Sequence, residues 1–253
     1  MKKLLFSALL FFAAQLLHAA SEQNMCIIIP AYNEAERIGF TIDQYAEYFN
    51  KRADILVVMN GCTDNTQEVV RASEAFKTGI LNCLELEQAG KGYAVTQGFL
   101  KALEGPYDMI GFVDADCATM PAAFDHLIQK LNQDKTDGII ASRYMQDAQS
   151  SQRPITKEWG RKLCFLPLVS CLYGLDYQDT QCGAKLFTRK VIERIAPQMR
   201  QPGWSFDIEL LYLARQEGFS VIEVPTIWED QPGSHLDTCS GGIPMILSLF
   251  CLR

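Results

Sequence analysis

A continuous apolar run, Met109 to Val113, ends abruptly at two aspartates separated by one small residue, in the sequence Gly-Phe-Val-Asp-Ala-Asp. Aspartate is a poor strand residue, and a carboxylate is costly to desolvate without a cation or hydrogen-bond donors. We therefore expect Asp114 and Asp116 just past the carboxyl end of a buried strand, where open α/β sheets bind ligands. Two such oxygen donors suit Mg²⁺ or Mn²⁺ carried by substrate phosphates, although an isolated Asp-x-Asp is more often a solvated turn.

The order of segments around this run predicts a mostly parallel sheet with helices on both of its faces. Apolar stretches of strand type alternate with stretches of helical periodicity, which is typical of α/β folds. The expected strands are residues 26–29, 54–59, 80–86, 109–114, 138–141, 184–187 and 220–224. The expected helices are residues 34–49, 63–76, 91–103, 121–131 and 206–217.

This alternation is interrupted after Ser142. Residues 143–159 are polar and irregular, and their length indicates a functional loop. Residues 162–175 are nearly all apolar and include Pro167, which predicts a helix in two pieces that is either buried or faces a membrane. The chain ends in an apolar segment, residues 241–253, which could pack on the core or lie on a membrane surface.

Composition restricts the class of protein. The chain has 253 residues, 48% of them hydrophobic, which is enough for one large α/β domain or two small ones. The formal net charge of −7 argues against a broad nucleic-acid surface. Nine cysteines are scattered without metal-ligand spacing, which indicates reduced thiols inside a cell.

The first 24 residues have a pattern of their own. Lys2 and Lys3 precede an apolar run from Leu4 to Leu17, as in a secretory signal peptide. The residues before Ala19 and Ala20 make a weak cleavage site, and the run is shorter than the roughly 20 residues of a membrane span. Three interpretations remain open: a cleaved signal, an uncleaved membrane anchor, and a misassigned start with translation beginning at Met25.

Five short patterns place polar or glycine residues near the ends of the expected strands. The third of them has a lysine between glycines at a helix start, where a phosphate can bind. Each pattern is a weak signal when taken alone. They are residues 29–34 (Ile-Pro-Ala-Tyr-Asn-Glu), 57–64 (Val-Val-Met-Asn-Gly-Cys-Thr-Asp), 90–95 (Gly-Lys-Gly-Tyr-Ala-Val), 114–116 (Asp-Ala-Asp) and 179–187 (Asp-Thr-Gln-Cys-Gly-Ala-Lys-Leu-Phe).

In combination these patterns resemble the family 2 nucleotide-sugar glycosyltransferases, from about Cys26 to His235. Two further motifs join them, residues 141–144 (Ala-Ser-Arg-Tyr) and 204–211 (Trp-Ser-Phe-Asp-Ile-Glu-Leu-Leu). The most similar group is that of the dolichyl- or polyprenyl-phosphate glucosyltransferases and mannosyltransferases. Its glucosyl branch is favoured, because Asp-Thr-Gln-Cys-Gly and Trp-x-Phe-Asp-x-Glu-Leu recur there together. The resemblance implies an inverting, metal-dependent hexosyltransferase with one GT-A domain, Rossmann-like, over residues 25–240.

The resemblance also assigns a donor site. Asp114 and Asp116 would hold Mg²⁺ or Mn²⁺ against the diphosphate of a nucleotide sugar, with UDP-glucose favoured over GDP-mannose. This chain has Met59-Asn60-Gly61-Cys62 where the family usually has Asp-Asp-Gly-Ser, so Asn60 would have to replace an acid as acceptor for the base. The residues expected to contact the nucleotide sugar are Pro30, Ala31, Tyr32, Glu34, Asn60, Lys91, Asp114 and Ala115.

For the acceptor, the resemblance implies a polyprenyl or dolichyl phosphate. A lipid phosphate is already an anion, so it needs positive charge to hold it in line more than it needs a general base. Arg143 and Arg161 stand where similar enzymes place acceptor-loop arginines, although Arg161 is equally compatible with a solvated surface. Asp207 would be a base for a hydroxyl acceptor or, slightly favoured, an acid at a helix start. The candidate catalytic residues are thus Asp116, Arg143 and Asp207.

Nucleotide sugars are cytosolic, so we expect a membrane-associated enzyme on the cytoplasmic face, with residues 1–24 as an anchor or a misassigned start. Two alternatives remain. One is a glycosyltransferase with a glycan or small-molecule hydroxyl as acceptor. The other is a non-catalytic secreted binding protein that kept the fold, for which the altered turn at Asn60 and the signal-like start are the support.

Overall fold

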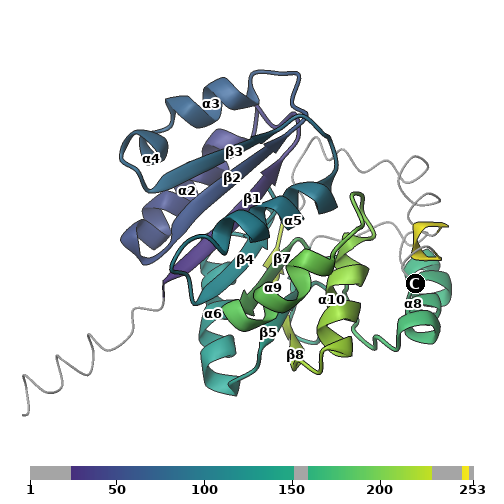
Figure 1. Ribbon diagram of the computed structural model, residues 1–253. Helices are drawn as coiled ribbons and strands as arrows, with labels where there is room; N and C mark the ends of the chain where they lie inside the picture. The colour runs from purple at the N-terminus through teal and green to yellow at the C-terminus, as the bar shows by residue number, and fades with distance from the viewer. Residues whose placement is uncertain (1–23, 151–158, 230–246, 251–253) are drawn as a thin grey trace, which may run out of the picture.

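The computed structural model describes residues 24–150, 159–229 and 247–250, which are built around a seven-stranded sheet of order β3-β2-β1-β4-β7-β5-β8 (Figure 1). Helices cover both faces of this sheet, so the prediction of a mostly parallel α/β fold is confirmed. Its strands are β1 (Met25–Ala31), β2 (Asp54–Asn60), β3 (Leu81–Leu86), β4 (Met109–Val113), β5 (Gly138–Ser142), β7 (Ala184–Thr188) and β8 (Val221–Pro225).

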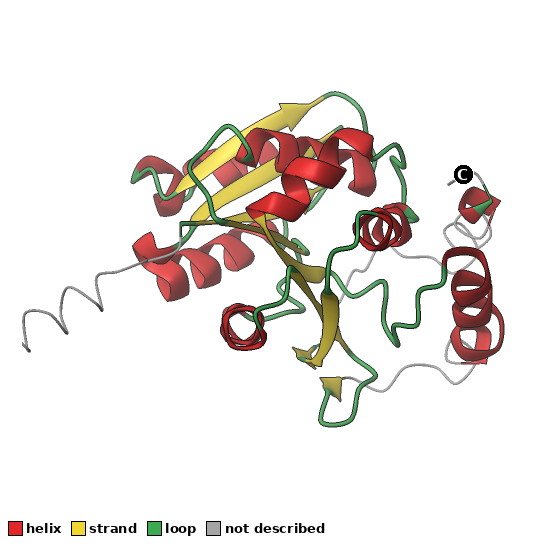
Figure 2. Ribbon diagram, turned by 60° about the horizontal axis from the view of Figure 1, so that its bottom comes forward, coloured by secondary structure: helices red, strands yellow, loops and turns green. Residues whose placement is uncertain are grey.

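The helices divide between the two faces of the sheet, as the rotated view in Figure 2 shows. The helices are α2 (Ile38–Phe49), α3 (Thr66–Ala72), α4 (Glu74–Lys77), α5 (Lys91–Ala102), α6 (Pro121–Asp134), α8 (Leu166–Tyr173), α9 (Arg189–Ile195) and α10 (Phe206–Gln216). Alternate residues of each strand face opposite sides, so Ile27 and Ile29 pack toward α2 and α6, whereas Ile28 packs toward α5, α9 and α10. Each face therefore has its own apolar core.

Strand β7 runs antiparallel to both of its neighbours, β4 and β5. The chain reaches it after the long segment that follows Ser142, and it enters the middle of the sheet rather than an edge. A small second sheet joins the same region, where β6 (Gln149–Ser150) pairs with β9 (Ile227–Trp228). The insertion of β7 places residues 179–183 at the edge of the sheet where β4 ends.

Several helix boundaries differ from those predicted. Helix α2 begins at Ile38 rather than at residue 34, because Asn33 has a positive φ of 53° and the chain turns before the helix starts. The helix expected over residues 63–76 is interrupted at Ser73, whose extended backbone ends α3 and whose hydroxyl accepts a hydrogen bond from the Phe76 N–H of α4. Helix α9 was not predicted.

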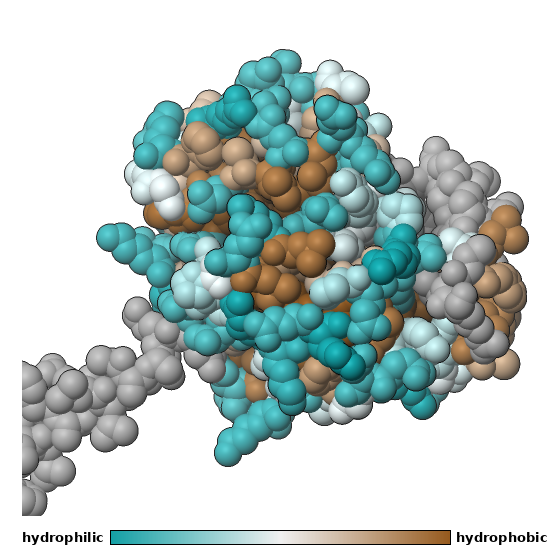
Figure 3. Space-filling view, viewed as in Figure 1, coloured by the Kyte–Doolittle hydropathy of each residue, from teal (hydrophilic) through white to brown (hydrophobic). Residues whose placement is uncertain are grey.

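The apolar stretch after residue 160 forms two helical pieces, as predicted. A π-helical turn, η2 (Arg161–Phe165), leads directly into α8, and Pro167 is the second residue of α8. The inner side of α8 packs on α10, with Val169 buried. Its outer side is apolar and exposed, with Leu163 of η2 63% accessible, and Figure 3 shows this hydrophobic flank beside α8.

Residues at the two ends of the chain are described only in part. Of the predicted C-terminal segment 241–253, the structure describes residues 247–250, in which Leu249 is buried and accepts a hydrogen bond from the Tyr173 hydroxyl. The predicted N-terminal segment lies outside the described residues up to position 23. Among the residues that are described, no helix combines the length and the apolarity needed to cross a bilayer.

Helix α2 offers a matched test of the core. Phe49 is fully buried and its ring stacks on Tyr45 at 5.8 Å between centroids, whereas Phe40 on the same helix is 56% exposed. We expect Phe49→Ala to lower the free energy of unfolding by about 3–5 kcal/mol because it leaves a cavity. Phe40→Ala should change it by about 0.5 kcal/mol or less. Urea unfolding followed by circular dichroism measures both, and equal losses would contradict the described packing.

Candidate active site

The carboxyl ends of β1, β2 and β4 open onto a cavity of about 460 Å³. Ligand sites of open α/β sheets lie at this edge. Every residue that the sequence predicted for the nucleotide sugar lines this cavity, except Ala31, which is fully buried beside it. The lining residues are Pro30, Tyr32, Glu34, Arg37, Asn60, Ala89, Gly90, Lys91, Asp114, Ala115, Asp116, Gly203 and Trp204.

Two carboxylates and two cations meet in this cavity. Asp114 directly follows β4, and its Oδ1 lies 2.5 Å from Nζ of Lys91. Asp116 accepts a hydrogen bond from the N–H of Ala118 at 3.0 Å, and Nη1 of Arg37 lies 4.0 Å from its Oδ2. Burial and the charge of Asp114 raise the pKa of the Asp116 carboxyl. Arg37, which also pairs with Glu34, was not predicted as a site residue.

The donor set fits a divalent cation that arrives with a diphosphate. No cluster of three or more histidine, cysteine, aspartate or glutamate side chains occurs among the described residues, so the protein offers no complete metal cage there. Mg²⁺ is commonly held by one or two carboxylates together with substrate phosphates and waters. Asp114 and Asp116 supply that number of hard oxygen ligands on the cavity wall.

Lys91 is fixed at the first residue of α5 by tight backbone packing. Gly90 has φ of 140°, and a Cβ atom on Gly92 would lie 2.2 Å from the carbonyl oxygen of Gln201. The ammonium group lies 5.2 Å from the ring centroid of Trp204 as well as against Asp114. Burial alone lowers the pKa of Lys91, but the carboxylates of Asp114 and Asp207 raise it overall. A charged lysine therefore faces the cavity.

Asn60 is buried at the end of β2 and bridges two backbone segments. With its amide oriented to satisfy both partners, the NH₂ group donates to the carbonyl of Ala31 at 2.8 Å and the oxygen accepts from Gly90 N–H at 2.9 Å. An aspartate at this position has no proton to donate to the Ala31 carbonyl. The amide thus connects β1 to the start of α5, and its role toward a base stays a prediction.

The motif at residues 204–211 has two parts in the site: Trp204 lines the cavity, and Glu209 holds the loop that carries Trp204. Glu209, in the first turn of α10, accepts hydrogen bonds from the N–H groups of Arg200 and Gln201 at 2.8 and 2.9 Å. These bonds hold the loop that carries Gly203 and Trp204 to the cavity wall. Glu209 and Trp204 were quoted only as part of a motif, and the sequence prediction gave neither of them a role of its own.

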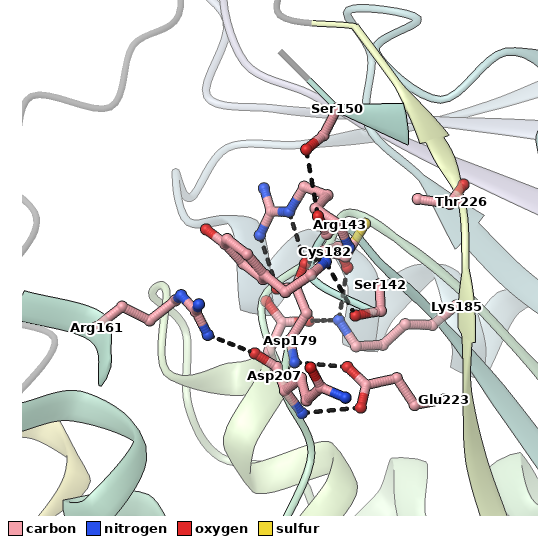
Figure 4. A network of polar contacts seen from close by, with 12 residues as sticks. Ser142, Arg143, Ser150, Arg161, Asp179, Cys182, Lys185, Asp207, Glu223 and Thr226 are labelled. Carbon is pink, nitrogen blue, oxygen red and sulfur yellow. Dashed lines mark hydrogen bonds and ion pairs between the residues drawn. The ribbon is translucent and has the colours of Figure 1, made fainter. Parts of the chain in front are cut away.

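Arg143 and Arg161 lie outside the lining of the cavity and are brought together around Tyr144. Arg143 donates from Nε and Nη2 to the two carboxylate oxygens of Asp179, at 2.7 and 2.8 Å, in the network of Figure 4. Arg161 reaches the same network from η2, with its guanidinium carbon 3.4 Å from the Tyr144 ring centroid. Arg143, which follows β5, and Arg161, which begins η2, thus both lie against the ring of Tyr144.

Asp179 is a rigid partner for Arg143. Its backbone N–H and that of Gln178 donate to the carboxylate of Glu223 on β8, at 2.6 and 2.8 Å. Burial alone would raise the pKa of the Asp179 carboxyl, but Arg143 and its hydrogen bonds hold that pKa below its usual range. The first aspartate of the Asp-Thr-Gln-Cys-Gly motif therefore stays ionised and orients Arg143.

Asp207 lies away from the cavity surface, in an ion pair with a fully buried lysine. Its Oδ1 is 2.5 Å from Nζ of Lys185, which also donates to the carbonyl of Cys182 at 2.7 Å. Asp207 is 3% exposed and does not line the cavity. This geometry favours the helix-start acid over the base for a hydroxyl acceptor.

The buried pair can be tested through stability. Lys185→Met leaves the Asp207 charge buried without its cation, and we expect a loss of about 3–5 kcal/mol in the free energy of unfolding. Adding Asp207→Leu should recover part of that loss, because no unpaired charge then remains. Urea unfolding of the two single variants and the double variant measures this coupling. Strictly additive losses would contradict a direct pair.

Comparison with known proteins agrees with the sequence motifs. Residues 26–196 match glycosyl transferase family 2. A dolichyl-phosphate beta-glucosyltransferase of Trichomonas vaginalis is 34% identical over 90% of this chain and 70% of its own length. The enzyme of the same name from Saccharomyces cerevisiae is 30% identical over 90% of this chain and 74% of its length.

Solved structures show the same fold. Glucosyl-3-phosphoglycerate synthase from Mycobacterium tuberculosis, in complex with Mn²⁺, UDP-glucose and phosphoglyceric acid, superposes with a TM-score of 0.69 at 18% identity, over 91% of this chain and 79% of that one. The predictions of a glycosyltransferase enzyme and of a GT-A fold are confirmed. The chain belongs to glycosyl transferase family 2.

Proposed function

We propose that this protein transfers a hexose, with glucose favoured, from a nucleotide sugar to a polyprenyl or dolichyl phosphate in a metal-dependent, inverting reaction. The observation that carries the proposal is the meeting of Asp114, Asp116 and Lys91 in one cavity at the end of β4. Relatives over nine-tenths of the chain are named dolichyl-phosphate beta-glucosyltransferases. That name supports both the sugar and the class of acceptor.

The donor favoured by these observations is UDP-glucose. The neighbouring structures of the same fold were solved with UDP or UDP-glucose together with Mn²⁺ or Mg²⁺. The cavity is lined by Tyr32, which is 45% exposed, and by Trp204, two aromatic side chains on which a base would stack, and by the carboxylate pair, which would face the diphosphate. GDP-mannose is the second candidate. Asn60 stands where the family usually presents an acid to the base, so this position does not select uracil over guanine.

The proposed reaction is a single displacement. An oxygen of the lipid phosphate attacks the anomeric carbon, the bond from that carbon to the nucleotide diphosphate breaks, and its electron pair leaves with the diphosphate. A divalent cation held by Asp114 and Asp116 would supply Lewis-acid stabilisation of the departing charge. Lys91 would add a positive charge at the same place, since its ammonium group already lies 2.5 Å from Asp114.

The acceptor phosphate is assigned to Arg143 and Arg161. Asp179 binds Nε and Nη2 of Arg143, and no hydrogen bond to its Nη1 occurs within the described ranges. A pre-oriented guanidinium loses little entropy when it binds an anion, which favours a phosphate held in line for attack. Arg161, packed on Tyr144, would contribute the second cation from η2.

The hydroxyl-acceptor alternative needs a general base, and Asp207 was its candidate. Asp207 is buried against Lys185 and separate from the cavity lining, so the observations favour the phosphate acceptor. A non-catalytic binding protein would have no need of the carboxylate pair and lysine that meet at the cavity. We therefore place both alternatives second.

We also propose that the protein works at a membrane surface, as a lipid acceptor requires. Trp159, just before η2, and Leu163, within η2, are 62% and 63% exposed, and Leu247 and Phe250 of the C-terminal segment are 62% and 60% exposed. Arg161 belongs to the same short helix, so a lipid headgroup entering along this flank would meet it. The N-terminal segment 1–24 stays a proposed anchor.

The donor half of the proposal can be tested by nucleoside diphosphate release. We expect release from UDP-glucose that depends on both Mn²⁺ and polyprenyl phosphate, and a loss of about 100-fold or more in Asp116→Ala or after chelation by EDTA. Asp125→Ala, an acid on α6 outside the cavity, is the matched control and should retain activity. Release without lipid dependence would move the acceptor to hydroxyl groups. No release with any nucleotide sugar would overturn the proposal.

The acceptor half is tested at Arg161. We expect Arg161→Ala to raise the KM for polyprenyl phosphate by about tenfold or more, because a charge-assisted contact to the phosphate is lost. UDP binding should stay unchanged, since Arg161 does not line the donor cavity. Arg71→Ala, which breaks an exposed pair with Glu85, serves as the control. A lost affinity for UDP with an unchanged KM for lipid would contradict the assignment.

A further inference from the structure

We propose that Gly183 is a positioning residue for Asp114. The absence of a side chain at position 183 leaves the space that the Asp114 carboxylate fills when it faces the donor cavity. This inference rests on the proposed function, because it takes Asp114 as a ligand of the cation that accompanies the diphosphate. The inference assigns a role to Gly183, the glycine of the Asp-Thr-Gln-Cys-Gly motif.

The Asp114 carboxylate lies so close to the backbone of Gly183 that no residue with a side chain fits at position 183 without a shift. A Cβ atom built on Gly183 would lie 1.9 Å from Oδ2, 2.2 Å from Cγ and 2.6 Å from Oδ1 of Asp114. Real Cβ atoms essentially never approach another heavy atom within 3.0 Å. The whole carboxylate group therefore lies over the Cα of Gly183, and even a methyl group there would displace it.

The backbone on either side of this contact is held in place. Val113 pairs with Ala184 in the antiparallel ladder, and the N–H of Asp114 donates to the carbonyl of Gly183 at 3.0 Å. The preceding carbonyl, that of Cys182, accepts a hydrogen bond from the buried ammonium group of Lys185. The backbone of neither strand can move away without breaking these hydrogen bonds. An added methyl group at position 183 would therefore displace the Asp114 side chain.

Lys91 also contacts the carboxylate, with its Nζ 2.5 Å from Oδ1. Asp114 is therefore in contact with the backbone of Gly183 and with a cation, and it lines the cavity. A carboxylate turned by a methyl group would present its oxygens to a metal in a different direction. Groups that orient metal ligands typically change metal affinity by about 10- to 100-fold when they are altered.

The test compares Gly183→Ala with Gly160→Ala. Gly160 has a negative φ and no atom within 4 Å of its Cβ position, and it lies outside the cavity lining, so its variant controls for the change from glycine to alanine. Calorimetric binding of UDP and of GDP is measured while Mn²⁺ is varied. We expect Gly183→Ala to need about tenfold more Mn²⁺ or more for half-maximal nucleotide binding, and Gly160→Ala to match wild type.

A double variant shows whether Gly183 acts through Asp114. Asp114→Ala removes the carboxylate, so adding Gly183→Ala to it should change neither the urea midpoint nor the residual nucleotide binding. If Gly183→Ala alone folds poorly, Asp114→Ala should restore its urea midpoint by removing the collision. Failure to restore it, or an unchanged Mn²⁺ requirement in a folded Gly183→Ala protein, would overturn the inference.

The outcome for wild type separates this inference from the proposed function. If the wild-type protein binds neither UDP nor GDP in a metal-dependent way, the proposed function fails and the metal argument fails with it. The urea midpoints of the single and double variants would then still decide whether Gly183 and Asp114 are in contact. If wild type binds as expected, only the behaviour of Gly183→Ala is at issue.

Discussion

The antiparallel pairing of β7 with β4 determines how this active site is assembled. A parallel sheet alone would bring together the ends of β1, β2 and β4, which carry the donor residues. Because β7 runs the other way, its first residues lie beside the last residues of β4. Gly183 therefore touches Asp114, and Asp179 pairs with Arg143, which directly follows β5 at the same edge of the sheet. The residues proposed for the donor and for the acceptor thus lie at one edge of the sheet.

Two ion pairs are buried behind this edge. A buried charge is strongly unfavourable unless it is paired and hydrogen-bonded. Arg143 has Asp179, and Lys185 has Asp207 together with the carbonyl of Cys182. The Lys185–Asp207 pair connects this region to α10, and Glu223 of β8 accepts hydrogen bonds from the backbone of Gln178 and Asp179, so the loop at residues 178–183 is held by regular elements of the fold. Rigid support of this kind is what a catalytic geometry requires.

The sequence predicted the sheet well, because strand patterns are local, and all but one of the residues that the family resemblance assigned to the donor line one cavity. A strand that ends in Asp-x-Asp and a lysine between glycines are readable from their own neighbours, and both line the cavity. The direction of β7 could not be predicted, since a five-residue apolar strand looks the same in either orientation. For the same reason Gly183 was quoted within a motif and given no role.

Side chains whose partners are far away in the sequence were the hardest to predict. Asp207 was predicted as a base or, slightly favoured, as an acid at a helix start, and its partner Lys185, 22 positions earlier in the sequence, was not foreseen. Arg37 was missed, because its approach to Asp116 depends on the turn at Asn33 that delays α2. Asn60 departs from the family pattern in a way that only the bridge between Ala31 and Gly90 explains. In each case the contact joins residues that are far apart in the sequence, so it depends on the fold and not on the adjacent residues.

In the proposed reaction, a lipid phosphate attacks the sugar directly, in line with the leaving diphosphate. The most direct measurement is the structure of the product formed from an α-linked nucleotide sugar and polyprenyl phosphate, by mass spectrometry and by the anomeric coupling in NMR spectra. A single displacement predicts a lipid-linked glycosyl phosphate with the β configuration. An α-linked product, or sugar found on a hydroxyl group or in water with the lipid phosphate unmodified, would contradict a single displacement by the lipid phosphate.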